Sequence, residues 1–421
     1  MTAIIPLFSA IALFWVAIGT TLYCYAGYPL VLWIAKQFRR KQAQTQTEPT
    51  FPDVTLIVAA YNEEQCVEQK MQNTLALQYP PEKLRIMWVI DGSTDRTSEL
   101  LAQYPQVTTL HQPQRLGKTA AINRAMEQVQ TPVAVLCDAN THLSPDAILH
   151  IVSAFADPQV GCVAGEKRVA RSAQTTEADH TEGAYWRYES LLKSLESDTG
   201  ATLSAAGELL ALRTALFAPM PPNTILDDFE LSMNIAMGGH RVVYCPQAWA
   251  TESGSANLDE EWKRKVRIAA GGFQQLCRRW RLLVNPLKNS ALWFKFVSHK
   301  LLRWAVVPLC LIIVPIANVA IVALTHGQSY STSFTFVTPI PNINIVAHVH
   351  TAFYQYTLAL TAAALMLALA GFALRHRKPP IKWLHLPYYM LMANVAQLTG
   401  MVRWLTGKQD VRWQKAQRNT D

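Results

Sequence analysis

Hydrophobic and polar positions divide the chain into a region of short apolar runs and several long apolar segments. Between residues 50 and 272, short apolar runs alternate with segments in which apolar residues recur at helical spacing. The runs predict strands over Val54–Ala60, Arg85–Ile90, Val107–His111 and Val133–Cys137, and the spaced segments predict helices over 65–77, 95–104 and 119–129. Strands that alternate with helices predict an α/β fold, in which helices cover the faces of a mainly parallel sheet.

Three further segments are long, apolar and free of acidic and basic side chains. They are Ile4–Ala35, Trp304–Leu324 and Thr351–Leu374. Each is long enough to cross a bilayer as a helix, and the first is too long for the apolar core of a signal peptide. We therefore expect three membrane spans, the first of them a retained anchor.

Two segments beside the C-terminal spans allow more than one interpretation. Residues 285–303 carry an amphipathic mixture of aromatic, basic and aliphatic side chains, which predicts a helix at the membrane interface. Residues 383–405 are apolar but contain His385, Pro387 and Arg403, so they enter and return, lie flat, or form a fourth crossing. The predicted organisation is an anchor over 1–36, an α/β domain over 50–272, the interfacial helix over 285–303, spans over 304–324 and 351–374, the ambiguous segment 383–405 and a basic tail over 406–421.

Composition and charge support a membrane protein. Only 16% of residues are charged, against roughly 25% in ordinary soluble domains. The net charge of +8 is gathered in clusters beside apolar segments, at Lys36–Lys41, Lys263–Arg267, Arg278–Arg281 and Arg375–Lys378. Such clusters mark the cytoplasmic side and contacts with membrane lipids, whereas no nucleic-acid recognition module accompanies them. The seven cysteines show neither paired nor metal-ligand spacing, so we expect reduced thiols and no zinc site.

Polar residues with catalytic potential follow the ends of three predicted strands. The first strand is followed by Tyr61-Asn62-Glu63, the second ends in Asp91-Gly92-Ser93-Thr94-Asp95, and the fourth ends in Asp138-Ala139-Asn140. In open α/β sheets, ligands bind outside the carboxyl ends of the strands. We therefore expect one ligand pocket at this edge. Local turns and helix caps are the alternative role for Asp91 and Asn140.

These motifs, in this order, resemble the nucleotide-sugar-binding half of the membrane-bound family 2 glycosyltransferases, in the branch of cellulose synthase-like and ceramide glucosyltransferase-like enzymes. The matching residues are Val58–Glu63, Asp91–Thr97, Arg115–Lys118 with Asn123, Asp138–Asn140, the pair Asp227-Asp228 and the basic block Arg264–Arg267. The resemblance covers about residues 52–272. It implies a Rossmann-like GT-A domain in the cytoplasm, with transmembrane helices on both sides of it in the sequence.

The resemblance also implies an activity. The expected enzyme is a membrane-anchored inverting glycosyltransferase, which moves a hexosyl or N-acetylhexosaminyl group from a nucleotide sugar to a lipid-linked or glycan acceptor. A UDP-sugar is the favoured donor, because Asp91 at its matched position accepts a hydrogen bond from the imide of uracil. Tyr61 is expected to stack on the base, and Glu63 belongs to the same set of nucleotide-sugar-binding residues. Surface packing is the alternative role of Tyr61.

Lys118, with Arg115, suits the diphosphate, because it begins a predicted helix after a glycine-containing loop. Asp138-Ala139-Asn140 matches the Asp-x-Asp metal motif of the family with asparagine in the last place. We therefore expect Mg²⁺ or Mn²⁺, with Asp138 as the main ligand and Asn140 as a weaker one, since an amide oxygen brings no charge.

The resemblance assigns the general base to Asp228, the second member of the pair Asp227-Asp228. A like-charged neighbour raises the pKa of a carboxyl, which suits a base. The alternative is that both acids only stabilise the start of a helix.

Residues 263–268 lie where processive relatives carry Gln-x-x-Arg-Trp. Arg264 and Arg267 are expected to bind the diphosphate, since arginine suits bidentate phosphate contacts; an ordinary basic helix at the membrane is the alternative. Ile268 replaces the Trp that lines the acceptor site in those relatives. We therefore expect an enzyme that adds one or a few sugars.

Two other functions stay open. One is a processive polysaccharide synthase that exports its product, for which a homo-oligomer could build the channel. The other is a membrane protein that binds a nucleotide without turnover. The acids at 91, 138 and 228 argue against the second function, because binding alone needs no base.

The basic cluster after the first apolar segment predicts that the N-terminus lies outside and residues 36–290 lie in the cytoplasm. Reporter fusions at residues 45 and 335 should therefore report opposite sides of the membrane. The same side for both fusions would contradict this topology.

Overall fold

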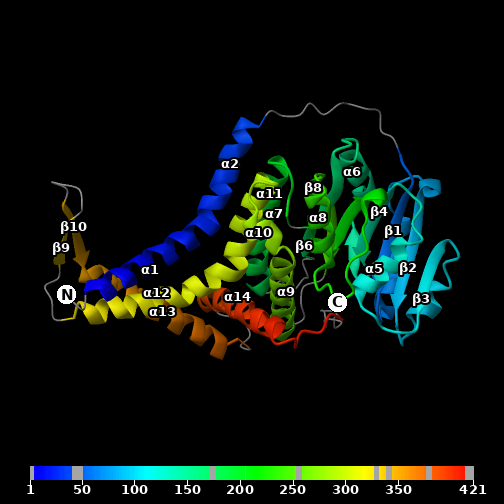
Figure 1. Cartoon of the computed structure of the whole chain (residues 1–421). Coiled ribbons are helices and arrows are strands. Elements are labelled where there is room, and N and C mark those ends of the chain that lie inside the picture. The colour runs from blue at the N-terminus through cyan, green and yellow to red at the C-terminus, as the bar shows by residue number, and fades with distance from the viewer. Residues whose placement is uncertain are drawn as a thin grey trace. The chain divides into compact units, whose positions relative to one another are not determined.

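The computed structural model describes residues 4–39, 51–169, 177–203, 205–252, 258–326, 331–337, 344–375 and 382–412 (Figure 1). The basic residues 40–41 and 376–378 and the end of the predicted tail, 413–421, lie outside the described residues. The chain forms two compact units. One contains residues 1–28 and 301–398, and the other contains residues 29–300 and 399–421. Each is described by itself.

The second unit is built on an eight-stranded sheet with the order β3-β2-β1-β4-β7-β6-β8-β5 (Figure 1). The strands are β1 (Val54–Ala60), β2 (Leu84–Asp91), β3 (Val107–Gln112), β4 (Val133–Asp138), β5 (Thr141–Leu143), β6 (Val160–Val169), β7 (Leu209–Arg213) and β8 (Arg241–Glu252). Strands β3, β2, β1 and β4 pair in parallel, as do β6 and β8. Strand β7 runs antiparallel between β4 and β6, and β5 is antiparallel to β8. The predicted α/β fold with a mainly parallel sheet is confirmed.

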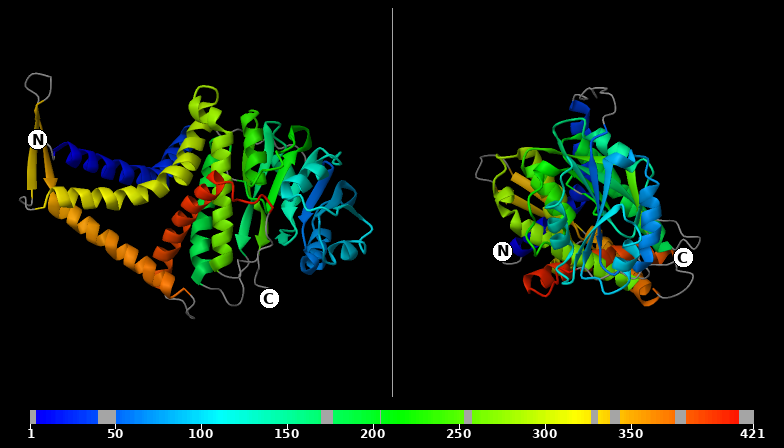
Figure 2. Two further views of the ribbon diagram at one scale, coloured as in Figure 1. Left: turned by 60° about the horizontal axis from the view of Figure 1, so that its bottom comes forward. Right: turned by 90° about the vertical axis from the view of Figure 1, so that its right-hand side faces the viewer.

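Helices lie on both faces of this sheet (Figure 2). They are α3 (Glu64–Leu75), α4 (Thr97–Leu101), α5 (Lys118–Met126), α6 (Ala147–Ala154), α7 (Glu177–Asp198) and α8 (Asp227–Met237), with short 3₁₀ turns at Pro81–Lys83 and Thr214–Leu216. The unit also contains α9 (Leu258–Arg278), α10 (Trp280–Val284) and α11 (Ser290–Lys295). Because both faces are covered, all seven residues of β1 are buried. Val54, Leu56 and Val58 pack with Trp88 in the core. The other face of the sheet presents Ile57 and Ala59 to the pocket described below.

The first unit consists mainly of long apolar helices. They are α1 (Ile4–Leu22), the π-helical turn η1 (Tyr23–Gly27), α12 (Val307–Leu324), α13 (Thr351–Ala373) and most of α14 (Lys382–Leu405), with a hairpin of β9 (Ser331–Val337) and β10 (Asn344–His350). Helix α2 (Tyr28–Phe38) continues from η1 and, apart from Tyr28, belongs to the second unit. In the described residues, three helical stretches are long and apolar enough to cross a membrane: 5–38, 290–324 and 351–373. Phe14 and Tyr354 are buried between them, and Trp15 Nε1 donates to Tyr354 Oη over 3.1 Å.

The segment expected at the membrane interface, 285–303, has a different local structure. From Ser290, α11 continues through the π-helix η4 (Phe296–Val306) into α12. The polar side chains of its first turns face α7. Lys295 Nζ donates to the Glu196 carbonyl over 2.7 Å, and His299 Nδ1 lies 2.6 Å from Glu196 Oε1. An amphipathic pattern does not distinguish protein partners from lipid headgroups, so the interfacial placement stays a prediction.

The segment 383–405 belongs to one unbroken helix, α14, with Pro387 inside it. Entering and returning, lying flat and a fourth crossing all stay predictions for this segment.

Candidate active site

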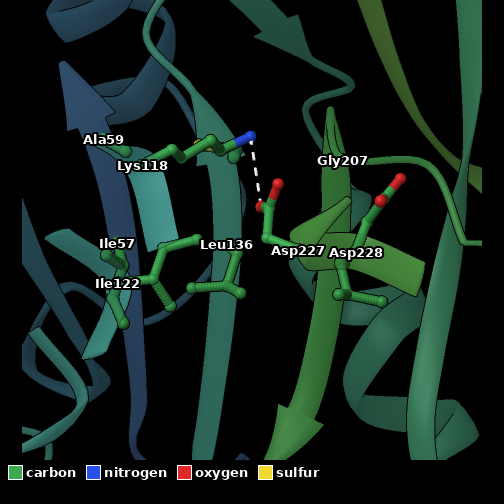
Figure 3. Close-up of a pocket in the computed structure, with 10 residues that line it drawn as sticks. Ile57, Ala59, Lys118, Ile122, Leu136, Gly207, Asp227 and Asp228 are labelled. Carbon is green, nitrogen blue, oxygen red and sulfur yellow. Dashed lines mark ion pairs between the residues drawn. The ribbon is translucent and has the colours of Figure 1, made fainter. Parts of the chain in front are cut away.

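A buried pocket lies beside the carboxyl ends of β1 and β4 (Figure 3). The parallel register pairs Ala59 with Asp138, so the two strands end at the same level. The pocket is lined by Ile57, Ala59, Lys118, Ile122, Leu136, Cys137, Gly207, Leu210, Asp227 and Asp228. Its apolar walls come from the sheet and α5, whereas its charged groups come from the N-terminal turns of α5 and α8.

Lys118 is the cation of this pocket. It begins α5, and its Nζ lies 2.6 Å from Asp138 Oδ1. The same Nζ lies 3.5 Å from Asp227 Oδ2 (Figure 3). Burial disfavours the charged ammonium, but Asp138 and Asp227 outweigh burial and raise the pKa of Lys118. Lys118 therefore stays charged at neutral pH and joins the end of β4 to the start of α8.

Asp228 has the carboxyl best suited to accept a proton. Burial, and then the charge of Asp227, raise its pKa to about 7, although Lys118 opposes the rise. Its Oδ1 accepts the N–H of Phe229 over 2.7 Å, which fixes the orientation of the carboxyl group. A Cβ added at Gly207 would lie 3.7 Å from Asp228 Oδ2 and 3.5 Å from Lys118 Nζ. Glycine at this position therefore leaves open the space in front of both groups.

A second charged cluster adjoins the pocket and was missed by the sequence-based prediction. Lys167, on β6, contacts Glu208 Oε1 and Glu252 Oε2, and it is only 3% exposed. Burial favours a neutral Glu208, but Lys167 and, more weakly, Arg264 lower its pKa to about 2. Burial raises the pKa of Asp138, and the nearby charges of Glu208 and Glu252 add to this rise while Lys118 opposes it. The one local signal for Glu208 is its place between a glycine and the apolar run Leu209–Leu212.

Asp91 is fully buried and holds the loop before Lys118. Its two carboxylate oxygens accept the backbone N–H of Leu116 over 3.1 Å and that of Gly117 over 2.7 Å. Gly92 has φ +69°, and a Cβ there would lie 2.7 Å from the backbone nitrogen of Arg115. Only glycine lets the two loops approach this closely. The hydrogen bond that Asp91 would accept from a base stays a prediction.

Tyr61 and Glu63 lie in the loop that follows β1. The guanidinium carbon of Arg115 lies 3.6 Å from the centroid of the Tyr61 ring, so a cation covers one side of the ring. The Glu63 N–H donates to Thr97 Oγ1 over 2.9 Å, and Glu63 stands at the start of α3. The loops after β1 and β2 are therefore fastened to each other, with Tyr61 beside Arg115.

Arg264 and Arg267 lie one turn apart on α9 and have different partners. Arg264 Nε donates to Glu261 Oε2 over 2.9 Å. Arg267 Nη2 donates to the carbonyl of Ile225 over 2.9 Å, and its buried Nε has no hydrogen-bond partner. Ile225 lies two residues before Asp227. Arg267 is thus tied to the segment that leads into the acid pair, whereas Arg264 lies near the Lys167 cluster.

Helix α8, which begins with the two acids, is held against α9 by buried charged groups. Glu230 Oε2 accepts from Gln275 Nε2 over 2.9 Å and from Arg278 Nη1 over 3.1 Å. Arg279 Nη2 lies 3.3 Å from Glu230 Oε1. Because an unpaired buried charge is costly, these pairs fix the rotation and height of α8, and hence the position of Asp228.

The family model described as "Glycosyltransferase like family 2" matches residues 52–271, about half of the chain, and contains every site residue named above. The chain belongs to glycosyltransferase family 2. This agrees with the family resemblance of its motifs.

Three known proteins are similar to this chain. Beta-monoglucosyldiacylglycerol synthase of Synechocystis sp. is 29% identical over 272 residues, which are 61% of this chain and 56% of that protein. Poly-beta-1,6-N-acetyl-D-glucosamine synthase of Staphylococcus aureus is 27% identical over 235 residues, which are 53% and 56% of the two chains. The chain thus spans about half the length of the curated relatives it matches. The structure of a mannosyltransferase of Pyrobaculum calidifontis, solved with GDP-Man and Mn²⁺, is also similar, with a TM-score of 0.66 and 24% identity. The match covers 94% of this chain and 100% of the mannosyltransferase chain. This likeness shows the GT-A fold.

Of the two expected metal ligands, Asp138 is the last residue of β4 and Asn140 lies in the turn that follows. The described residues contain no group of three or more histidine, cysteine or acidic side chains arranged to hold a metal ion. Asp138 Oδ1 is paired with Lys118, and Asn140 Nδ2 lies 3.5 Å from Glu252 Oε1. The turn therefore offers one carboxylate and one amide oxygen.

The raised pKa of Asp228 predicts a stability effect that needs no substrate. A carboxyl whose pKa rises from 3.8 to about 7 on folding favours the folded state below pH 3.8, and this contribution is lost as the pH rises to about 7. Asp228→Asn should therefore stabilise the protein progressively between these values and by up to about 4 kcal/mol above them. The measurement is the unfolding temperature in detergent from pH 4 to pH 8.

Asp53→Asn is the matched control, because Asp53 is 39% exposed and paired with Lys83 at the surface. It should show no such rise. If the unfolding temperature of Asp228→Asn equalled that of the parent at every pH, the raised pKa of Asp228 would be contradicted.

Proposed function

We propose that this chain is a membrane-anchored, inverting glycosyltransferase at the cytoplasmic face of the plasma or inner membrane. It moves a hexosyl or N-acetylhexosaminyl group from a UDP-sugar to a lipid-linked or glycan acceptor. The observation that carries this proposal is the buried Asp228, next to Asp227 and in one pocket with Lys118. A binding protein needs the cation for phosphate, but it does not need a carboxyl with a pKa near 7.

Asp228 is the general base of the proposed reaction. The acceptor oxygen attacks C1 of the donor sugar, the bond from C1 to the diphosphate oxygen breaks, and the acceptor proton moves to Asp228. One displacement inverts the anomeric carbon. The bond from Phe229 N–H to Oδ1 leaves Oδ2, which faces the open space at Gly207, to take the proton.

Basic groups at the start of α5 and within α9 are proposed to bind the leaving diphosphate. Lys118 lies at the N-terminus of α5, where backbone N–H groups and the helix dipole favour an anion. The buried Nε of Arg267 has no hydrogen-bond partner and can donate to a phosphate oxygen. Arg264 gives up its hydrogen bond to Glu261 and donates to phosphate oxygens when the donor binds. Charge-assisted contacts of this kind stabilise the negative charge that develops on the departing group.

A divalent cation, Mg²⁺ or Mn²⁺, is proposed at Asp138 and Asn140. Such ions often bind through one or two protein oxygens plus substrate phosphates, so the single carboxylate and amide oxygen of this turn fit the group. Once bound, the cation neutralises charge on the diphosphate. Lys118 is close enough to Asp138 to balance its charge when no donor is present. The structural relative was solved with Mn²⁺, which supports the choice of ion.

The nucleotide is proposed to lie along the loops after β1 and β2. Tyr61 supplies a ring for the base, Glu63 belongs to the same loop, and Asp91 is the residue that favours uracil by its matched position. The structural relative was solved with GDP-Man, so the fold alone is compatible with more than one base.

A processive synthase that exports its product is the second candidate, because one relative is named a poly-N-acetylglucosamine synthase. Ile268, where processive relatives carry Trp, favours one or a few additions. The other proposed partners are membrane lipids, and a homo-oligomer is needed only if a polymer crosses the membrane.

Loss of the base should abolish turnover without abolishing donor binding. Asp228→Asn should lower the rate of UDP release from a cognate nucleotide sugar by about 10²-fold or more, because general-base catalysis typically contributes that much. UDP affinity, measured by calorimetry, should stay within a few-fold of the parent. Asp53→Asn should keep full activity, and near-normal turnover in Asp228→Asn would refute the assignment.

Activity should depend on a divalent cation held mainly by Asp138. Excess chelator should stop UDP release, and Mg²⁺ or Mn²⁺ should restore it. Asn140→Asp should lower the metal concentration needed for half-maximal activity, because it adds a hard anionic ligand. Full activity in chelator would rule out the metal, and an unchanged metal requirement in Asn140→Asp would remove Asn140 from the site.

A further inference from the structure

The segment that leads into the acid pair, Met220–Leu226, is irregular but buried. It belongs to no helix or strand, and Met220, Thr224 and Ile225 are each 2% exposed. Buried backbone N–H and C=O groups need hydrogen-bond partners, and an irregular segment cannot supply them from its own ladder. The position of the acids that follow therefore depends on the groups that bind this segment.

Helix α5 holds this segment at two points. Asn123 Nδ2 donates to the Met220 carbonyl over 2.8 Å, and the Met220 N–H donates to Asn123 Oδ1 over 3.0 Å. About one turn earlier on the same helix, Thr119 Oγ1 donates to the Thr224 carbonyl over 3.1 Å. The amide of Asn123 thus satisfies both backbone groups of one residue of the segment.

Helix α9 holds the same segment closer to the acids, through Gln274. Its Nε2 donates to the Asn223 carbonyl over 2.6 Å, and its Oε1 accepts the Ile225 N–H over 3.0 Å. Gln274 is only 6% exposed. A Cβ added at Gly271 would lie 2.5 Å from Leu226 Cγ, so the helix and the segment are in direct contact. Both polar ends of the Gln274 side chain are therefore bound to the segment that carries the proposed base.

The two helices that hold this segment also carry the cations proposed to bind the diphosphate. Lys118 begins α5, and Arg267 lies on α9, where its Nη2 donates to the Ile225 carbonyl over 2.9 Å. The cations and the base are thus placed by one hydrogen-bonded frame. Such a frame matters because a displacement of about 1 Å in a reacting group can cost about 10²-fold in rate.

We propose that Gln274 and Asn123 are positioning residues of the reaction, which fix Met220–Leu226 and thereby place Asp228 for proton transfer. This inference rests on the proposed function and adds two residues to its machinery. Neither side chain lines the pocket, so both act through the segment. Without the amide of Gln274, a buried N–H and a buried carbonyl lose their partners, and the segment moves to regain them.

The test compares variants that remove or keep these hydrogen bonds. Gln274→Leu removes both bonds at α9, Gln274→Glu keeps an acceptor for the Ile225 N–H, and Asn123→Leu removes the pair at Met220. Gln69→Leu is the matched control, because Gln69 is exposed on α3. UDP release from a cognate UDP-sugar gives kcat and donor KM, and calorimetry with UDP gives the affinity and the number of binding sites. Each kcat is expressed per UDP-binding site, so that unfolded protein does not count as slow enzyme.

Gln274→Leu should lower kcat about tenfold, whereas donor KM and UDP affinity stay within about twofold, because only the base is displaced. Gln274→Glu should recover kcat to within about threefold of the parent, and Asn123→Leu should lower it about threefold, since its pair lies farther from the acids. Gln69→Leu should match the parent. An unchanged kcat in Gln274→Leu, or a loss of UDP affinity as large as the loss of kcat, would overturn the positioning role.

A double-mutant cycle shows whether Gln274 acts through Asp228. In the Asp228→Asn background the base is already absent, so adding Gln274→Leu should change the residual rate by less than about twofold. The same tenfold loss in both backgrounds would mean that Gln274 acts elsewhere, and the proposed base would be unaffected by this result.

A measurement without substrate separates this inference from the proposed function. If the parent releases no UDP from any nucleotide sugar, the proposed function fails, and the unfolding temperature decides the role of Gln274. Asp228→Asn should then raise the unfolding temperature above pH 7 less in the Gln274→Leu background than in the parent, because Asp228 is no longer held in its buried place. An equal rise in both backgrounds would show that Gln274 does not position Asp228.

Discussion

The ion pairs of Lys118 with Asp138 and Asp227 are the interactions on which the arrangement of the pocket depends. They join the start of α5, the end of β4 and the start of α8, which are distant in sequence. Without this ammonium, the two acids would face each other in a buried space, and removing one partner of a buried pair typically costs about 3–5 kcal/mol. The cation that suits a diphosphate is therefore also the group that assembles the site around it.

The same pairing separates the roles of two neighbouring acids. Asp227 lies against Lys118, whereas Asp228 points to the space at Gly207 and has a pKa near 7. The hydrogen bonds of Glu230 with Gln275 and Arg278 of α9 fix the position of α8, and with it that of Asp228.

Much of the fold and the first half of the site could be predicted from the sequence, because their signals are local. An apolar run that ends in a carboxylate and turn residues identifies both a strand and the edge where a ligand binds, as at Asp91 and Asp138. The motif order then added Lys118 and Asp228 through the family resemblance.

The rest depends on pairings that no local pattern contains. Strand β7 runs antiparallel between β4 and β6, and this order brings Glu208 to Lys167. Nothing near Lys167 or Glu252 in the sequence indicates that they adjoin the pocket. The contact of Asp91 with a base stays a prediction, and the sequence did not indicate that its carboxylate also holds the neighbouring loop. The polar side chains of the amphipathic turns after Ser290 contact α7. The sequence could not predict this contact, because a protein partner and a lipid surface favour the same periodicity.

The central claim is a single displacement in which Asp228 takes the acceptor proton. The most direct test is the anomeric configuration of the first product formed from an α-linked UDP-sugar, read from the proton coupling constant in NMR before any isomerisation. The account predicts a β-linkage in every product molecule. An α-linkage would require a covalent intermediate or a different attack, and would contradict the role assigned to Asp228.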